Sequence, residues 1–421
     1  MVNRLGEDKE SKVLRSVYFL RKPTRSDIVR STGISPVSVT AILRRLIERG
    51  LVEKSGKLQT RSGRPSARYK LHSSIGHTVG ISVTTSGFQI AAVDADNQVI
   101  STREHTLELS TSPVGHVDDI VRQISDGLKA FSELPDLAGR TALSIGVSLP
   151  GMVDTERGVW LHGLQVSGIT HIPLQKIVEG LSGLPVVVED MARCLAFLEA
   201  ERRWPEGAEH LVLLCLDAGV GTGIIINGEP YPGVHGLAGE AGHLVVDEGG
   251  GRCPCGNIGC LETVVSQPSI LRRFKQRLSE GVISSLQRYR TVDGPPLTLE
   301  AIRDAAAAGD RLARSTLFEV GTLLGDACSK IIKLYNPRTL VIGGSVALLG
   351  EFLKEPVWIK IRQKVIPEML EDFSLEISPS SPGDQALGAA ILAARRFWKK
   401  TEAARARFGP RAAHLILPRK S

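Results

Sequence analysis

The sequence predicts an α/β protein with a body of two similar lobes, preceded by a small α+β domain. After residue 72, short apolar runs such as HTVGISV, LVLLCL and TLVIGG alternate with helical segments, which is typical of an α/β fold. Residues 80–100 and 212–231 share one design of strand, small-residue turn and second strand, which suggests duplicated lobes with a ligand cleft. The first 72 residues differ from this, because they are basic and are predicted to be mainly helical.

Charge divides the chain in the same way. Residues 1–72 carry 17 Lys and Arg against 6 Asp and Glu, and residues 395–421 carry 9 against 1. Because the whole chain has a formal net charge of +7, the region between them carries a net charge of −12. A basic head on an acidic body favours a nucleic-acid partner, although charged faces are often only solvated, so charge alone leaves both interpretations open.

Length and composition narrow the class of protein. A chain of 421 residues is expected to form two or three domains. No apolar run approaches the roughly 18 residues of a membrane span, and the charged opening MVNRLGEDKESK lacks the apolar core of a secretory signal. We therefore expect a cytoplasmic protein without a membrane partner, in which the cysteines are not paired as disulfides.

The basic head begins with two predicted helices. Ser11–Leu20 has apolar residues at helical spacing and one face to bury. Thr24, with Asp27 three residues later, resembles a capping box that starts the second helix, and Gly33 is suited to end it in a left-handed conformation. The head is therefore expected to begin with two helices in succession.

A third helix has the composition of a DNA-reading helix. It starts at Ser35 with a proline in its first turn and ends at Gly50. One face is apolar, and the opposite face carries small residues first and arginines later, which suits contact with base edges and phosphates in a major groove. We expect the DNA contacts from this face to be Val37, Ser38, Ala41, Arg44 and Arg45.

Two short strands and a basic loop follow, as in a winged helix-turn-helix. The loop contains Arg61 and Arg64 in the sequence Arg-Ser-Gly-Arg-Pro, which resembles arginine hooks that enter a narrow minor groove. Helix-turn-helix domains also serve as protein-contact modules, but the basic face favours DNA.

A second motif combines cysteines and a histidine within eighteen residues of a glycine-rich segment. The spacings are Cys-x-Cys and Cys-x4-Cys, whereas a redox dithiol is normally Cys-x-x-Cys. Three cysteines and one histidine are a usual ligand set for structural zinc, with no open position for catalysis at the metal. The predicted zinc ligands are His243, Cys253, Cys255 and Cys260, and the other cysteines, which we expect to be unreactive core residues, are Cys194, Cys215 and Cys328.

Two glutamates lie beside these ligands. Glu240 comes three residues before His243, and Glu262 follows Cys260 by two. Carboxylates held in place can accept hydrogen bonds from paired hydroxyls, which is how proteins bind sugars. Spacing alone leaves open that both are solvated loop residues.

These motifs together resemble the ROK family of repressors, open reading frames and sugar kinases. The resemblance rests on Gly-Glu-Ala-Gly-His at 239–243 and Cys-Pro-Cys-Gly-Asn-Ile-Gly-Cys-Leu-Glu at 253–262. It extends through Gly-Val-Ser-Leu-Pro-Gly at 146–151, Val-Ile-Gly-Gly at 341–344 and Gly-Asp-Gln-Ala-Leu-Gly-Ala at 383–389. It covers the chain from the winged head to about Trp398.

The resemblance implies an actin-like, ribonuclease H-like body of two lobes. The expected regions are a winged helix-turn-helix at 1–72 and a sugar-binding body at 73–398 with its zinc loop at 239–262. Residues 399–421, beyond the resemblance, have the composition of a basic, disordered tail. The residues that the resemblance implies for sugar contact are Asp190, Glu240, His243 and Glu262, with Glu189 where the family has asparagine. In a kinase of this family, Asp190 would be the catalytic base.

The phosphate loops separate a kinase from a regulator. Family kinases have Asp-x-Gly-Gly-Thr after the first strand, where this chain has Ser-Val-Thr-Thr-Ser at 82–86. Asp217-Ala218 replaces the first Gly-Thr of the second loop and sets a carboxylate where a triphosphate would be repelled. We expect a DNA-binding regulator, a repressor in the first instance, that binds a sugar or sugar phosphate without phosphorylating it.

Several alternatives stay open. An ATP-dependent sugar kinase with a DNA-binding head is the main one, followed by an activator, a regulator without a small ligand, and a zinc-stabilised scaffold. Glu189 and Gln165 replace residues that would touch hydroxyls, so the identity of the sugar is not predicted. The expected partners are operator DNA, the sugar effector and a second copy of the chain in a homodimer or higher oligomer, because such heads read palindromic sites.

Overall fold

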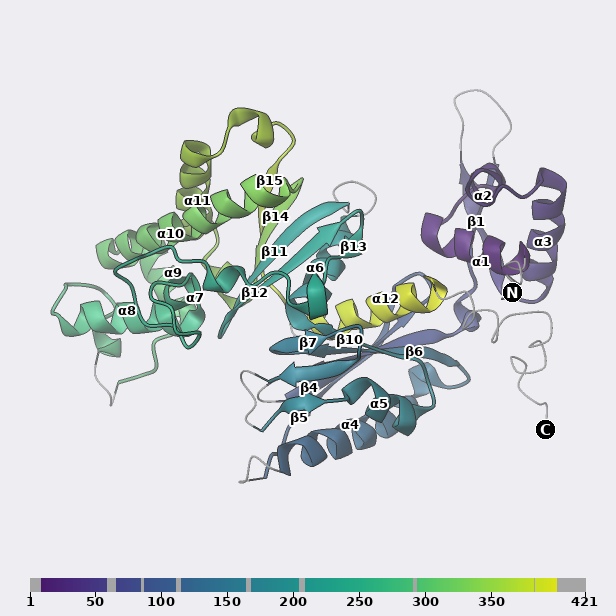
Figure 1. Cartoon of the computed structure of the whole chain (residues 1–421), viewed down its shortest axis with the longest axis horizontal. Helices are drawn as coiled ribbons and strands as arrows, with labels where there is room; N and C mark the ends of the chain where they lie inside the picture. Colours follow the sequence, from purple (N-terminus) through teal and green to yellow (C-terminus); the bar gives the residue numbers. More distant parts are fainter. Residues whose placement is uncertain are drawn as a thin grey trace. The chain divides into compact units, whose positions relative to one another are not determined.

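The computed structural model describes residues 9–58, 66–84, 87–110, 115–163, 168–203, 209–290, 294–381 and 383–399 (Figure 1). The predicted Arg61, Arg64, Gln165 and the tail beyond Lys399 lie outside these ranges. The chain forms two compact units, one of residues 1–189 and 385–421 and the other of residues 190–384. Over the described ranges, no helix has the length and apolar character needed to cross a bilayer.

The head is the three-helix and two-strand domain that the sequence predicts. Thr24 and Asp27 form a complete capping box, and Gly33 ends the second helix with a φ of 67°. Ser35 accepts a hydrogen bond from the backbone N–H of Ser38 and so caps the third helix. The elements are α1 (Lys9–Leu20), α2 (Arg25–Thr32), α3 (Pro36–Glu48), β1 (Val52–Leu58) and β2 (Ser66–Leu71).

The core of the head includes side chains from the other end of the chain. The apolar stripe of α3 packs against α1, α2 and the wing strands. Phe397 and Trp398, at the end of α12 (Asp384–Lys399), belong to the same buried cluster. The Trp398 ring stacks on Tyr18 with centroids 5.5 Å apart, and the Arg395 guanidinium lies over Phe19. The head is therefore packed onto α12.

The remainder of the first unit is a five-stranded sheet between helices. The strand order is β10-β6-β3-β4-β5, with β3 antiparallel to β4 and parallel to β6. A small antiparallel sheet of β7, β8 and β9 adjoins it in sequence. The bounds are β3 (His77–Val83), β4 (Gly87–Asp94), β5 (Val99–Thr106), α4 (His116–Ser132), β6 (Ala142–Leu149), β7 (Met152–Asp154), β8 (Val159–His162), β9 (Thr170–Ile172), α5 (Leu174–Ser182) and β10 (Val186–Asp190).

The two faces of this sheet are covered differently because side chains alternate along a strand. Val79, Ile81 and their neighbours pack on α4 and α5, which lie on one side of the sheet in Figure 1. On the other side, a Cβ at Gly80 would lie 1.8 Å from the carbonyl oxygen of Ala386, and one at Gly146 would lie 2.0 Å from that of Ala389. Glycine at these positions lets α12 lie directly on the strands.

The second unit repeats this design. Its sheet has the order β13-β12-β11-β14-β15, with β11 antiparallel to β12 and parallel to β14. The matching topology confirms the predicted duplication. The bounds are α6 (Met191–Arg202), β11 (His210–Leu216), β12 (Val220–Ile226), β13 (Glu229–Pro230), α7 (Glu262–Val265), α8 (Gln267–Ser279), α9 (Leu299–Ala307), α10 (Arg311–Tyr335), β14 (Thr339–Gly343), α11 (Glu351–Lys364) and β15 (Ser374–Ser378).

Helices also cover both faces of the second sheet. A Cβ at Gly223 would lie 2.3 Å from the carbonyl oxygen of Ala192, so α6 packs closely on β12. The opposite face carries the largest buried cluster, formed with α7 to α11.

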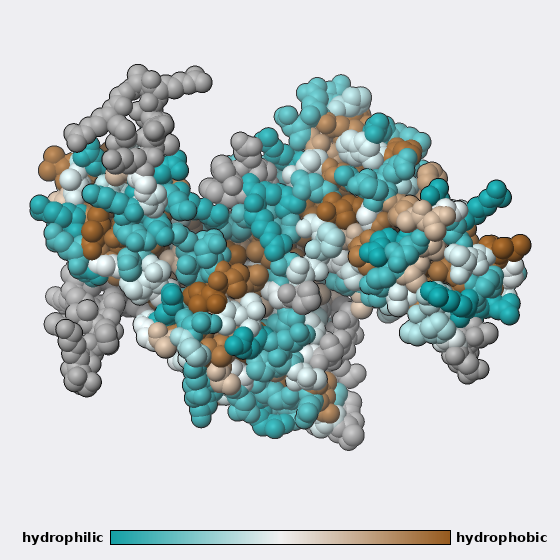
Figure 2. All heavy atoms as spheres, turned by 180° about the vertical axis from the view of Figure 1, so that it is seen from behind, coloured by the Kyte–Doolittle hydropathy of each residue, from teal (hydrophilic) through white to brown (hydrophobic). Residues whose placement is uncertain are grey.

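On the face of the molecule drawn in Figure 2, hydrophilic residues predominate and hydrophobic ones form separate patches. Among the described residues, the short 3₁₀ helices are η1 (Ser73–Ile75), η3 (Pro135–Leu137), η4 (Val234–Gly236), η5 (Ala241–His243), η6 (Gln287–Tyr289), η7 (Ser345–Leu349) and η8 (Pro367–Leu370).

Candidate metal centre and its carboxylates

The cysteine-rich segment of the second unit folds back on itself as an irregular hairpin. Isolated bridges pair Val245 with Cys260 and Arg252 with Ile258. The turn is tight, because a Cβ at Gly259, whose φ is 75°, would lie 1.6 Å from the carbonyl oxygen of Asp247. Only glycine fits there. This fold brings Cys260 back to the histidine seventeen residues before it.

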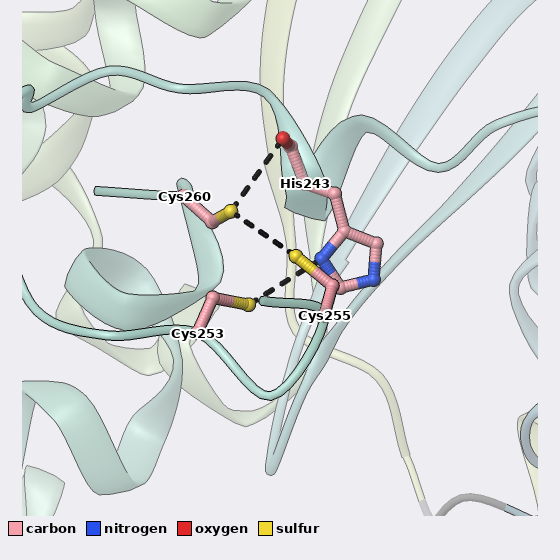
Figure 3. Close-up of side chains that lie close together, drawn as sticks. All are labelled: His243, Cys253, Cys255 and Cys260. Carbon is pink, nitrogen blue, oxygen red and sulfur yellow. Dashed lines mark hydrogen bonds between the residues drawn. The ribbon is translucent and has the colours of Figure 1, made fainter. Parts of the chain in front are cut away.

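The four predicted metal ligands meet at one point, as Figure 3 shows. Their ligand atoms all lie within 4.8 Å of one another. The Cys253 sulfur is 3.6 Å from Nδ1 of His243, and the sulfurs of Cys255 and Cys260 are also 3.6 Å apart. Ligands held at about 2.3 Å from a tetrahedral ion lie roughly 3.6 to 3.8 Å from each other. The cluster therefore has the composition and the size of a metal site.

The three thiols of the cluster differ in how readily they ionise. Burial raises the pKa of the Cys260 thiol to about 12 and raises that of Cys253. In Cys255, which is exposed, a hydrogen bond from the backbone of Asn257 lowers the pKa. Three thiolates close together are stable only beside a positive charge, which a metal ion would supply.

The other cysteines lie in the apolar cores, as predicted. Cys194, Cys215 and Cys328 are at most 2% exposed. Burial raises the pKa of Cys328 to about 12 and that of Cys215 well above its ordinary value, so neither thiol ionises near neutral pH. These are not reactive thiols.

His243 connects the metal cluster to Glu240. Its Nδ1 faces the cysteines, and its Nε2 lies 3.7 Å from Oε2 of Glu240. A metal on Nδ1 would leave the proton on Nε2, where it can be donated to the carboxylate or to a ligand. The Glu240 side chain is half exposed, so it is held on one side and accessible on the other.

Glu262 is held by the β11–β12 hairpin. It is the first residue of α7, and its Oε2 accepts a hydrogen bond from the backbone N–H of Val220 at 3.0 Å. The carbonyl oxygen of Val220 lies against Gly242, where a Cβ would be only 2.7 Å away. Val220 thus contacts the segments that carry Glu240 and Glu262, and the structure brings these two segments together.

Asp190 and Glu189 stand in different environments although they are neighbours. Asp190 is partly exposed and caps α6, with its Oδ1 accepting the N–H of Arg193 at 3.1 Å. Glu189 is only 2% exposed. Asp190, Glu240, His243 and Glu262 all belong to the second unit, whereas Glu189 falls in the first. Their contacts with a sugar remain predictions.

Arg193 was not predicted from the sequence. It is 2% exposed and donates from Nη1 to the carbonyl oxygens of Gly236 and Ala238, at 3.0 and 3.4 Å. These carbonyls immediately precede the Gly239-Glu240 motif. The signal in the sequence is a single arginine within the otherwise apolar start of α6, MARCLAFL, directly after Asp190.

The loops that would hold a triphosphate in a kinase are occupied by side-chain contacts. Oδ1 of Asp217 accepts the backbone N–H of Ser345 at 2.6 Å, and the Asp217 carbonyl accepts that of Gln267. In the first unit, Ser82 donates to the Gln385 side chain at 2.7 Å. The Asp217 carboxylate therefore binds a backbone amide of the kind that a phosphate oxygen would otherwise use.

On the predicted DNA face of the head, some residues are exposed and one also pairs with another helix of the head. Val37 is 81% exposed at the start of α3, and Arg44 is exposed farther along it. Ser38 and Ala41 are partly exposed. Arg45 is exposed as well and donates to Glu10 of α1 at 2.8 Å, and Arg49 donates to the same carboxylate. Arg45 thus joins two helices of the head as well as lying on the predicted face.

A basic groove runs between α3 and the wing strands. It has a volume of about 740 Å³ and includes the cationic residues Arg25, Arg44 and Lys54. Arg25 also donates to Thr40 of α3 at 3.2 Å. Arg25 and Lys54 were not predicted, and their signal is weak because each is one basic residue among many in the head. Their place in the groove suits phosphate contacts.

Three features together define the class of protein. They are a duplicated two-lobed α/β body, a cluster of one histidine and three cysteines next to carboxylates, and a winged helix-turn-helix head. The class is that of actin-like, sugar-kinase-type proteins that carry a DNA-binding-type head. The chain belongs to the ROK family, whose family model matches residues 78–396.

Known relatives include both regulators and kinases. The chain is 26% identical to the DNA-binding transcriptional repressor Mlc of Escherichia coli K12, over 93% of this chain and 94% of Mlc. It is 33% identical to a glucokinase of Halalkalibacterium halodurans over 62% of this chain and 76% of the enzyme. The solved structure of a ROK family transcriptional regulator, a homolog of the E. coli Mlc protein, superposes with a TM-score of 0.78 and 26% identity, covering 92% and 96% of the two chains. The regulator matches extend over the head, whereas the glucokinase match covers a smaller part of the chain.

Proposed function

We propose that this protein is a sugar-responsive, DNA-binding transcriptional repressor. The observation that carries the proposal is the capped helix-turn-helix, with its exposed face on α3 and its basic groove, joined to a ROK body. The likeness to Mlc over nearly the whole of both chains supports it. Arg44, Arg25 and Lys54 contact phosphates or bases in this proposal, and Val37 packs against a base edge.

The proposed cofactor is one structural zinc ion held by His243, Cys253, Cys255 and Cys260. Four protein ligands leave no open position, so the ion fixes the loop and activates no water. The fixed loop presents Glu240, and the Nε2–H of His243 beside it, to the effector. Together with Glu262 and Asp190, these groups accept and donate hydrogen bonds to the hydroxyls of a sugar or sugar phosphate.

We propose that the body does not phosphorylate the sugar. Phosphoryl transfer requires backbone amides and a magnesium ion around the triphosphate. The Asp217 carboxylate uses the N–H of Ser345 and adds a negative charge at that loop. The favourable observation for a kinase is Asp190, which stands where the family has its base, together with the likeness to a glucokinase.

Control of DNA binding follows from differential affinity. A sugar that binds one conformation of the body more tightly than another shifts the population toward that conformation. A hundredfold loss of operator affinity requires a preference of about 2.7 kcal/mol, which a few hydrogen bonds supply. The operator-bound form in this proposal is a homodimer or higher oligomer, because one head reads one half-site of a palindrome.

The decisive experiment combines effector binding with operator release. A duplex selected by the protein from a random-sequence library serves as operator, and calorimetry is run against monosaccharides and their 6-phosphates, with and without a non-hydrolysable ATP analogue. One sugar is expected to bind, to weaken operator affinity by roughly 10- to 100-fold, and to remain unphosphorylated with ATP. Phosphorylation at ordinary kinase rates would overturn the repressor assignment in favour of the kinase, and failure to select any DNA would overturn both the head's role and the proposal.

A further inference from the structure

Glu240 lies on a segment that a metal ion can hold from one side only. The ligand His243 is three residues after Glu240, and no predicted ligand precedes it. On the preceding side the chain passes through residues 231–239, a loop with no α-helix or strand. A carboxylate that orients a sugar hydroxyl must be fixed to within a fraction of an ångström. The structure therefore needs a second anchor before Glu240.

The 231–239 loop has an unusual backbone, in which the N–H of Leu237 donates to the carbonyl oxygen of Val234 and the N–H of Ala238 to that of Pro232. Gly233, His235, Gly236 and Gly239 all have positive φ angles, between 56° and 100°. His235 has this conformation despite its side chain, which is disfavoured for non-glycine residues. Such a conformation persists only where the surroundings impose it. Two carbonyls of this loop, those of Gly236 and Ala238, converge on the guanidinium of Arg193.

Arg193 is itself fixed on the sheet. It belongs to the first turn of α6, which packs on β12 so closely that Gly223 admits no side chain. Its own N–H is accepted by Asp190, the N-cap of the same helix. Gly239 also lies on β12, since a Cβ there would be 2.5 Å from the carbonyl oxygen of Thr222. The helix that Asp190 caps and the start of the Glu240 segment thus both pack on β12.

We propose that Arg193 is a positioning residue of the effector site, which sets Glu240 relative to Asp190 by clamping the 231–239 loop onto α6. This inference rests on the proposed function of the site. Arg193 holds the chain just before Glu240, and the metal, through His243, holds the chain just after it. Arginine suits this role because its planar, always charged guanidinium donates in several directions to carbonyl oxygens. Methionine would fill the space without donating, and lysine would donate from a single point.

The test compares two arginines at opposite ends of the same helix, α6. Arg193→Met removes the clamp, whereas Arg203→Met is the matched control. Arg203, at the C-cap of α6, is also largely buried, but it pairs with Glu199 and Glu376 instead of the loop carbonyls. Both variants are expected to lower the melting temperature. Hydrogen exchange of residues 233–242 and zinc content are measured first, because neither needs a sugar.

Arg193→Met is expected to speed amide exchange in residues 233–242 at least tenfold and to keep its zinc, while Arg203→Met leaves exchange there unchanged. Sugar affinity is expected to fall at least tenfold in Arg193→Met only, with Arg193→Lys in between. Unchanged exchange, or faster exchange with unaltered sugar affinity, would overturn the proposal. Should the methionine variant not fold, Arg193→Lys decides by the same readouts. A wild-type protein that binds no sugar refutes the proposed function, and the exchange data then decide whether the clamp exists.

Discussion

At the scale of single residues, Glu262 combines a structural contact with the proposed ligand contact. Its Oε2 accepts the N–H of Val220, which fixes the carboxylate at the start of α7. A carboxylate fixed in this way accepts a hydroxyl hydrogen bond without first losing side-chain freedom. Its negative charge strengthens that hydrogen bond relative to a neutral acceptor.

Glu262→Gln removes the charge but keeps an oxygen that can accept from Val220. We expect sugar affinity to fall by about 10-fold or more, since a charged hydrogen bond contributes roughly 1.5–3 kcal/mol. Operator affinity without sugar is expected to stay the same. Calorimetry and operator titration check both. Glu248→Gln, an exposed glutamate of the same loop, is the control, and equal sugar affinity in the two variants would contradict the assignment of Glu262.

The sequence predicts the position and contacts of some single residues but not of others. The clustering of His243 with the three cysteines was predictable because their types and short spacing already restrict them to one small loop. Arg193 and the pairing of Arg45 with Glu10 were not, because each depends on segments 35 to 45 residues away. The contrast between a buried Glu189 and a partly exposed Asp190 is also invisible in a sequence that gives them as neighbours.

At the scale of elements, the predicted zinc loop, residues 239–262, contains little regular structure. Its described backbone pairs through two isolated bridges and a few turn hydrogen bonds. If the cluster binds the proposed ion, a loop of this kind would gain its order from that ion, and metal binding and folding of the loop would be one process. The sheet and helices beneath it have their own apolar core.

Cys255→Ser tests this dependence without disturbing the core, because Cys255 is exposed. We expect bound zinc to fall from about one ion per chain to near none, since structural sites use all four ligands. The melting temperature is expected to drop by several degrees as binding free energy is lost. Metal analysis and thermal denaturation check this. Chelation of the wild-type protein should reproduce the shift and added zinc should reverse it, whereas a variant that keeps its metal would refute the ligand assignment.

Most elements follow from local sequence, and their arrangement does not. The caps at Thr24 and Ser35 and the glycine at 33 are local signals, and the structure confirms them. The predicted strands were recognisable as short apolar runs because both faces of each are covered. Strand order, register and the place of α12 depend on pairings across hundreds of residues, as between Ser82 and Gln385. The spacing of apolar residues along the chain carries no information about strand order, register or the place of α12.

At the scale of the whole molecule, α12 links parts of the first unit that are distant in sequence. Its first half lies on β3 and β6 at two glycines, and its last turn completes the core of the head. Displacing this helix is therefore expected to affect the body and the head together. The duplication and the family were predictable from repeated motifs, but this sharing of one helix was not, since nothing in residues 1–72 indicates that their core is incomplete.

Gly80→Ala should displace α12, because the new methyl group would lie 1.8 Å from a backbone carbonyl. Overpacking of this kind costs about 1–3 kcal/mol or more. Gly180→Ala, within α5 and with open space around it, should instead stabilise the protein by roughly 0.5–1 kcal/mol. Denaturant unfolding measures both. Operator affinity should fall with Gly80→Ala only, and equal stability of the two variants would contradict the close packing of α12.

The position of Phe397 and Trp398 inside the head has a consequence for the order in which the chain is made. The helices that would read DNA leave the ribosome first, yet the two aromatic side chains that complete their core are among the last of the described residues to be synthesised. A nascent or prematurely terminated chain that lacks them has a head with part of its apolar surface uncovered. We therefore expect a chain that ends before Phe397 to have a less stable head than the full chain.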